Sequence, residues 1–152
     1  MASNELPRFL YRGTTRGWPG NDASREENRT CATTDPLVAT VFAVHCRHFG
    51  AAVLHVFDTR DYEIVESTNC LANIEAEVLV KSNPLDFAAA AVRTIDVDEA
   101  IEILDAMGFE IPNRLPASAV QLTRFLQIER DRRLQPDQIA EFNRRCGVSD
   151  DE

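Results

Sequence analysis

The feature that most constrains the fold is the segment at residues 73–81, NIEAEVLVK, in which acidic and apolar side chains alternate. Side chains alternate between the two faces of a β-strand, so this pattern predicts a strand with Glu75 and Glu77 on one face and apolar residues on the other. The two carboxylates would lie about 7 Å apart. A sheet with one solvated face explains such acids, and a working pair of carboxylates is the alternative. The segment alone favours the solvated face.

The composition predicts one soluble globular domain. A chain of 152 residues is long enough to bury a hydrophobic core, and 44% hydrophobic with 27% charged residues is ordinary for such a domain. The net charge of -9 disfavours a general electrostatic attraction to nucleic acid or to an anionic membrane, so neither partner is expected. A local basic pocket for a small phosphate ligand stays open, and the oligomeric state is not predicted.

The cysteines and the N-terminal segment bear on metal binding and compartment. Cys31, Cys46, Cys70 and Cys146 are widely spaced, without a CxxC pair or a histidine at zinc-finger spacing, so we expect no metal and favour free buried thiols over disulfides. The N-terminus lacks the features of a cleavable signal peptide, and no segment is long enough to cross a bilayer. We therefore expect a cytoplasmic protein. Delivery into a host or target cell without a cleavable signal stays open.

The first part of the chain predicts strands around one helix. Residues 9–12 form a short aromatic strand ended by Gly13, and residues 14–29 form a long loop of a kind that is often functional. Trp18 in this loop is interpreted as a hydrophobic plug. Residues 51–57 and 62–65 are the next expected strands.

The helix between these strands begins at a capping pair. Asp35 is an N-cap residue, and the proline after it suits the first helical position. We expect the helix to end at Gly50. Thr33 and Thr34 then precede a helix N-terminus, where hydroxyls and free N–H groups meet acceptors. The expected buried stripe of this helix comprises Leu37, Val38, Val41, Phe42 and His45. His55 in the following strand is interpreted as a structural histidine.

The C-terminal part predicts helices. Residues 85–95 fit a helix or a strand, and helices are expected at 96–107, 116–133 and 136–146, the last ended by Gly147. Asp96 and Glu99 resemble a capping box at the start of the first of these helices. We therefore predict an α+β protein. Its two parts are a β-rich core at residues 1–84 and a helical portion at residues 85–152, packed on the same domain and ending in a loose acidic tail.

Three motifs in chain order suggest a family. They are YRG at residues 11–13, TTDP at 33–36 before a helix containing VATVFA, and EAEVL at 75–79. This set resembles the mono-ADP-ribosyltransferase family of the arginine/serine/glutamate type, with toxin-like members, over about residues 8–81. The resemblance implies an ADP-ribosyltransferase-like split β-sheet core with a helical C-terminal extension, and NAD as the substrate.

The resemblance also implies roles for the residues that would bind NAD. Arg12 would hold the NAD phosphates with a forked, permanently charged donor, and the backbone of Gly13 would approach the nicotinamide amide. Thr33 and Thr34 complete the expected NAD-binding set. Thr33 stands where the family has the first serine of its Ser-Thr-Ser element, and it would orient the catalytic carboxylate. Asp35 replaces the last serine of that element.

The two glutamates would have different tasks. Glu77 would bind the ribose hydroxyl and stabilise the oxocarbenium-like state as nicotinamide leaves, and Glu75 would assist an arginine acceptor. The loop at residues 66–73 matches the position of the acceptor-recognition loop. The implied function is transfer of ADP-ribose from NAD to a protein side chain, with arginine as the expected acceptor and no metal required. The alternatives are an NAD glycohydrolase on the same fold and a catalytically inactive module that binds a partner.

Overall fold

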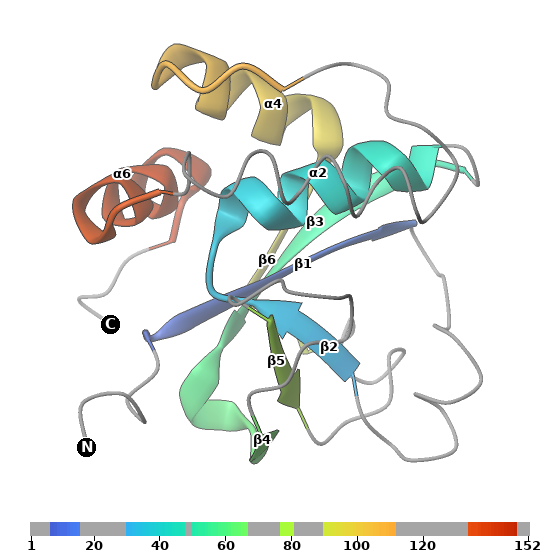
Figure 1. Cartoon of the computed structure of the whole chain (residues 1–152), viewed down its shortest axis with the longest axis vertical. Helices are drawn as coiled ribbons and strands as arrows, with labels where there is room; N and C mark the ends of the chain where they lie inside the picture. The colour runs from blue at the N-terminus through green and yellow to red at the C-terminus, as the bar shows by residue number, and fades with distance from the viewer. Residues whose placement is uncertain are drawn as a thin grey trace.

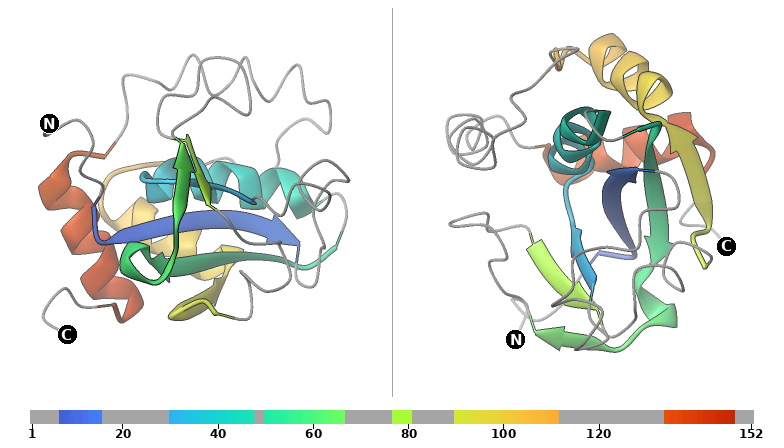
Figure 2. Two further views of the ribbon diagram at one scale, coloured as in Figure 1. Left: turned by 90° about the horizontal axis from the view of Figure 1, so that it is seen from below. Right: turned by 90° about the vertical axis from the view of Figure 1, so that its right-hand side faces the viewer.

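The computed structural model describes residues 7–15, 30–47, 50–66, 77–80, 90–111 and 134–148. Six antiparallel strands form one sheet in the order β4-β5-β2-β1-β3-β6. The three α-helices of the described residues lie on one side of this sheet (Figure 1), and Figure 2 shows the same layering from two further directions. The α+β class is therefore confirmed. The strands are β1 (Phe9–Thr15), β2 (Thr30–Thr33), β3 (Ala52–Asp58), β4 (Ile64–Glu66), β5 (Glu77–Val80) and β6 (Arg93–Asp96), and the helices are α2 (Pro36–Cys46), α4 (Val97–Ala106), α6 (Pro136–Cys146) and the short 3-10 helix η3 (Thr59–Asp61).

Strand β1 is longer than the sequence suggested. It pairs with β3 along its whole length, from Phe9 opposite Asp58 to Thr15 opposite Ala52, so the expected end at Gly13 is wrong. The glycine instead permits a close approach of helix and strand. A Cβ atom on Gly13 would lie 2.6 Å from the backbone nitrogen of Ala43 in α2, and nearer still to the carbonyl oxygen of Ala39. Only a residue without a side chain fits there.

Helix α2 begins where the sequence predicted and ends earlier. The Asp35 side chain accepts a hydrogen bond from the backbone N–H of Leu37 at 2.8 Å, as an N-cap residue should. The helix ends at Cys46, so the expected end at Gly50 is wrong. The predicted stripe was also too narrow, because α2 packs on β1 and β3 on one side and against α4 on another. The buried residues are Pro36, Leu37, Val38, Ala39, Thr40, Val41, Ala43 and Val44, whereas Phe42 and His45 are only half-buried.

The segment after β3 turns back through η3 into β4. Strand β4 starts at Ile64, two residues later than the strand expected at residues 62–65. Tyr62 lies outside the strand and packs edge-on against Phe57, with ring centroids 6.1 Å apart. Asp58 caps η3 by accepting a hydrogen bond from the backbone N–H of Arg60 at 3.0 Å. The connection between β3 and β4 is therefore one turn of 3-10 helix.

The C-terminal part contributes a strand as well as helices. The undecided stretch at residues 85–95 leads into β6, which pairs with β3. Asp96 ends β6 and precedes α4, but its side chain makes no capping hydrogen bond, so the predicted capping box with Glu99 is wrong. Helix α6 has the predicted bounds, and Gly147 ends it with a left-handed φ of 91°. The helix predicted at residues 116–133 and the loop containing Trp18 lie outside the described residues.

The sheet is covered by apolar side chains on both faces. On the helix side, Tyr11 of β1 and Leu54 of β3 belong to a buried cluster with Leu104 of α4 and Phe142 of α6. The opposite face carries a smaller cluster, which consists of Leu10, Ala32, Phe57 and Val80. Within the described part of the chain, no helix has both the length and the apolar character needed to span a membrane.

Candidate functional site

The strands that carry the three sequence motifs are neighbours in the sheet. Thr33 of β2 pairs with Tyr11 of β1 on one side and with Glu77 of β5 on the other. Adjacent strands lie about 4.8 Å apart, so this row spans about 10 Å from the first motif to the third. We call the pairing of Tyr11 with Thr33 the β1–β2 junction. Among the described residues the two strands pair only there, and their ribbons diverge beyond it (Figure 1).

Thr33 is the polar centre of this row. Its side chain is only 4% exposed, and its Oγ1 accepts a hydrogen bond from the backbone N–H of Asp35 at 3.2 Å. A hydrogen bond from the N–H group two residues further along closes a local turn, which threonine often forms between a strand and a helix. A hydroxyl that accepts one hydrogen bond can still donate its own hydrogen. Thr33 is therefore able to orient a carboxylate. Thr34 is half-buried in the bend that follows.

Asp35 has a structural role. It is 3% exposed, its Oδ1 caps α2 through Leu37, and its Oδ2 accepts a hydrogen bond from the backbone N–H of Leu134 at 3.3 Å. Both carboxylate oxygens thus bind backbone N–H groups on different elements. The sequence shows only the cap, because Leu134 lies 99 residues further along the chain. This double anchoring gives residue 35 a structural reason to be an aspartate.

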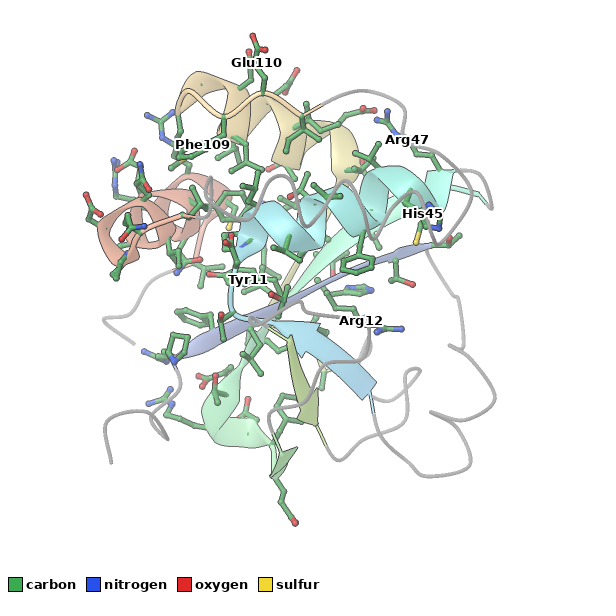
Figure 3. All side chains as sticks on the ribbon, in the orientation of Figure 1. Tyr11, Arg12, His45, Arg47, Phe109 and Glu110 are labelled. Carbon is green, nitrogen blue, oxygen red and sulfur yellow. The ribbon has the colours of Figure 1, made fainter. Side chains whose placement is uncertain are left out.

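Arg12 follows the junction residue Tyr11 on β1. It is half-buried and pairs with His55 of β3, so it does not share the register row of Thr33 and Glu77. In Figure 3 its side chain extends into the region where β1 and β2 diverge. Burial raises the pKa of the Cys46 thiol at the end of α2, and the Arg12 guanidinium lowers it in part. The charge of Arg12 therefore acts toward the C-terminal end of α2, and alternation along β1 sets its side chain on the other face of the sheet from Tyr11. Its part in NAD binding stays a prediction.

The other predicted site residues are described only in part. Glu77 is described through its backbone, which pairs with Thr33. Glu75 and the loop at residues 67–73 lie outside the described residues, so the acceptor role of Glu75 stays a prediction. The close approach of α2 explains why residue 13 is a glycine, and the expected contact of its backbone with nicotinamide also stays a prediction.

Sequence reasoning missed the partner of Tyr11 at the junction and gave His55 on β3 only a general structural role. Tyr11 is fully buried, and its hydroxyl donates a hydrogen bond to Oδ1 of Asn143 in α6. Its place in the aromatic alternation of β1 could have indicated burial, but nothing local indicates a partner 132 residues away. His55 is 6% exposed, pairs with Arg12, and lies with its Nδ1 2.8 Å from Oγ1 of Thr94. The structural interpretation of His55 agrees with these contacts.

An acidic depression of about 660 Å³ lies elsewhere, at the C-terminal end of α2. Thr33 precedes the N-terminal end of the same helix, roughly 16 Å away at 1.5 Å per residue. The depression is therefore separate from the candidate site. Its charged lining residues are Arg47, Asp96, Asp98, Glu99 and Glu102. Across the described ranges, no three or more histidine, cysteine, aspartate or glutamate side chains are grouped so that they could hold a metal ion.

Comparisons with known proteins identify no relative of this chain. No protein-family model matches the chain, and neither the curated proteins nor the solved structures contain a significant match.

Proposed function

We propose that this chain is an NAD-dependent mono-ADP-ribosyltransferase that modifies a protein side chain, with arginine as the acceptor and an ADP-ribosyltransferase-like split-sheet core. The observation that carries the proposal is the row in which Tyr11, Thr33 and Glu77 pair across three strands. Motifs from distant parts of the sequence meet within about 10 Å in this row. Thr33 and Glu77, two of the residues to which the resemblance gives catalytic roles, are direct cross-strand neighbours in this row.

The chemical type of each residue suits its proposed role in the reaction. Arg12 holds the pyrophosphate of NAD, because a guanidinium forms paired, charge-assisted hydrogen bonds with phosphate oxygens. The Thr33 hydroxyl donates a hydrogen bond to the Glu77 carboxylate and fixes its orientation. The glycosidic C–N bond then breaks and nicotinamide leaves as a neutral base. The carboxylate of Glu77 stabilises the positive charge that develops on the ribose.

The reaction is completed by transfer of ADP-ribose, in which the acceptor binds the ribose carbon that nicotinamide has left. A guanidinium nitrogen of the acceptor attacks the cationic ribose carbon and forms a new C–N bond. Glu75 takes the proton that this nitrogen loses. Water in place of the acceptor gives free ADP-ribose, which is the glycohydrolase reaction.

The test is nicotinamide release from NAD, measured with the unsubstituted chain and with Glu77→Gln. Glutamine keeps the size of the side chain and removes its charge, so we expect release to fall about 100-fold or more. A matched control is Glu141→Gln, a change of the same kind in the middle of α6, which should leave release unchanged. Equal release by the unsubstituted chain and Glu77→Gln refutes the proposal. Release of free ADP-ribose with no labelled protein would establish the glycohydrolase instead.

A further inference from the structure

We propose that α6 fixes the spacing of strands β1 and β2 at their junction, with Tyr11, Asp35 and Asn143 as positioning residues for the candidate site. The catalytic consequence rests on the proposed function, whereas the mechanical part concerns the fold alone.

The first contact joins α6 to β1. The Tyr11 hydroxyl donates a hydrogen bond to Oδ1 of Asn143, and the Tyr11 ring packs edge-on against Phe142 with ring centroids 6.0 Å apart. Tyr11 and Phe142 are fully buried and Asn143 is 6% exposed. A buried hydrogen bond of this kind has no solvent to replace it, so it holds both partners in place.

The second contact joins the segment just before α6 to the residues that follow β2. Asp35 lies two residues after Thr33, and its Oδ2 accepts a hydrogen bond from the backbone N–H of Leu134, just before α6. The far end of α6 is fixed as well, because Nε of Arg93 donates a hydrogen bond to the carbonyl oxygen of Cys146 at 2.9 Å. Figure 1 and Figure 2 show α6 beside the N-terminal ends of α2 and β1.

The junction needs such support because its strand pairing is short. Strand β1 pairs with β3 along its whole length, from Phe9 to Thr15, but its described pairing with β2 is confined to Tyr11 and Thr33. A single pair fixes the spacing of two strands poorly. Tyr11 belongs to this pair, and Asp35 lies two residues after its other member, Thr33. The contacts to Asn143 and Leu134 therefore act on the two strands at the point where they separate.

The spacing of the two strands decides the distance between Arg12 and the pair formed by Thr33 and Glu77. In the proposed reaction Arg12 holds one part of NAD while Glu77 acts on another. A displacement of about 1 Å between binding and reacting groups can lower a rate about 100-fold. None of the three positioning residues needs to touch NAD for this effect.

The test compares Tyr11→Phe with Tyr62→Phe. Both changes remove one hydroxyl from a tyrosine packed edge-on against a phenylalanine, but Tyr62 packs on Phe57 away from the junction. We expect Tyr11→Phe to speed amide hydrogen exchange in residues 30–33 about tenfold more than in residues 53–56. The same variant should lower kcat for nicotinamide release about tenfold or more, with the KM for NAD changed less than about threefold. Tyr62→Phe should do neither.

A second variant acts from the β2 side. Asp35→Asn keeps an oxygen to cap α2, since asparagine is an equally good N-cap residue, and its NH₂ group cannot accept the hydrogen bond from Leu134. It should reproduce the local exchange pattern of Tyr11→Phe, and it serves as the test if Tyr11→Phe fails to fold. Faster exchange spread evenly over all strands, or none in residues 30–33, overturns the inference. Absence of NAD turnover by the unsubstituted chain refutes the proposed function and leaves the exchange result to decide this inference.

Discussion

Gly13→Ala is the sharpest perturbation of the fold around the candidate site. A Cβ atom at this position would lie 2.6 Å from the backbone nitrogen of Ala43, 0.8 Å short of the 3.4 Å at which ordinary contact begins, and nearer still to the carbonyl oxygen of Ala39. Both atoms belong to the backbone of α2, so no flexible side chain can move aside. The whole helix must withdraw from β1. Because overpacking of a core costs about 1–3 kcal/mol, we expect a loss at the upper end, about 3 kcal/mol.

The assay is equilibrium unfolding in urea. With an m-value of about 2 kcal/mol/M, a loss of about 3 kcal/mol lowers the midpoint by about 1.5 M. The matched control is Gly108→Ala. Gly108 has a φ of 94° and nothing within 4 Å of an added Cβ, so alanine there brings backbone strain of about 1–2 kcal/mol without a clash. If Gly13→Ala destabilises the chain less than Gly108→Ala does, the close approach of α2 to β1 is refuted.

Two further predictions concern Asp58 and Thr33. The pKa of Asp58 falls from 3.8 to about 2, chiefly through hydrogen bonds from Arg60, so its contribution to stability is complete above pH 3.8 and disappears as the pH falls through about 2. Since Arg60 is 63% exposed and screened by solvent, Asp58→Asn should cost only about 1–2 kcal/mol of unfolding free energy at pH 7. In urea titrations at pH 2, where the folded carboxyl is half protonated, the difference from the unsubstituted chain should shrink to about 0.2–0.4 kcal/mol, and a difference as large as at pH 7 contradicts this reasoning. Thr33→Val keeps the shape of the side chain and removes its hydroxyl, so it should lower nicotinamide release about 10- to 100-fold, whereas Thr33→Ser should stay within about threefold; equal rates for valine and serine would remove the hydroxyl from the mechanism.

Local signals in the sequence predicted the elements that are determined locally. Helix α6 has its predicted bounds because a proline suits its first turn and Gly147 adopts the left-handed conformation that ends it. The start of α2 was predicted for a similar reason, since Asp35 caps it within the same few residues. Such features depend on neighbours in sequence, so they can be predicted without knowing the fold.

Features that depend on distant partners were predicted poorly. Gly13 resembles a strand end in sequence, but the reason for a glycine is the backbone of α2, about 30 residues away. Strand β6 follows an alanine-rich stretch that fits helix or strand, and its pairing with β3 decides the outcome. No residue near Tyr11 in the sequence indicates its contact with Asn143.

The candidate site falls between these cases. The motif order suggested that Arg12, Thr33 and Glu77 belong together, and the sheet does pair Thr33 with Glu77. It sets Arg12 one residue along β1 from the row, opposite His55. Alternation within a strand predicts which residues share a face, but it does not predict which strands are neighbours, so this arrangement could not be predicted from the sequence alone.

A crystal structure of the chain with NAD bound would show whether the β1–β2 junction is the NAD site. We expect NAD at the β1–β2 junction, with the Arg12 guanidinium on the pyrophosphate and a Glu77 carboxylate oxygen about 2.6–3.2 Å from a hydroxyl of the nicotinamide ribose. Thr33 should lie within hydrogen-bond distance of the same carboxylate. NAD bound away from the row of Tyr11, Thr33 and Glu77, or no NAD bound at millimolar concentration, would contradict it.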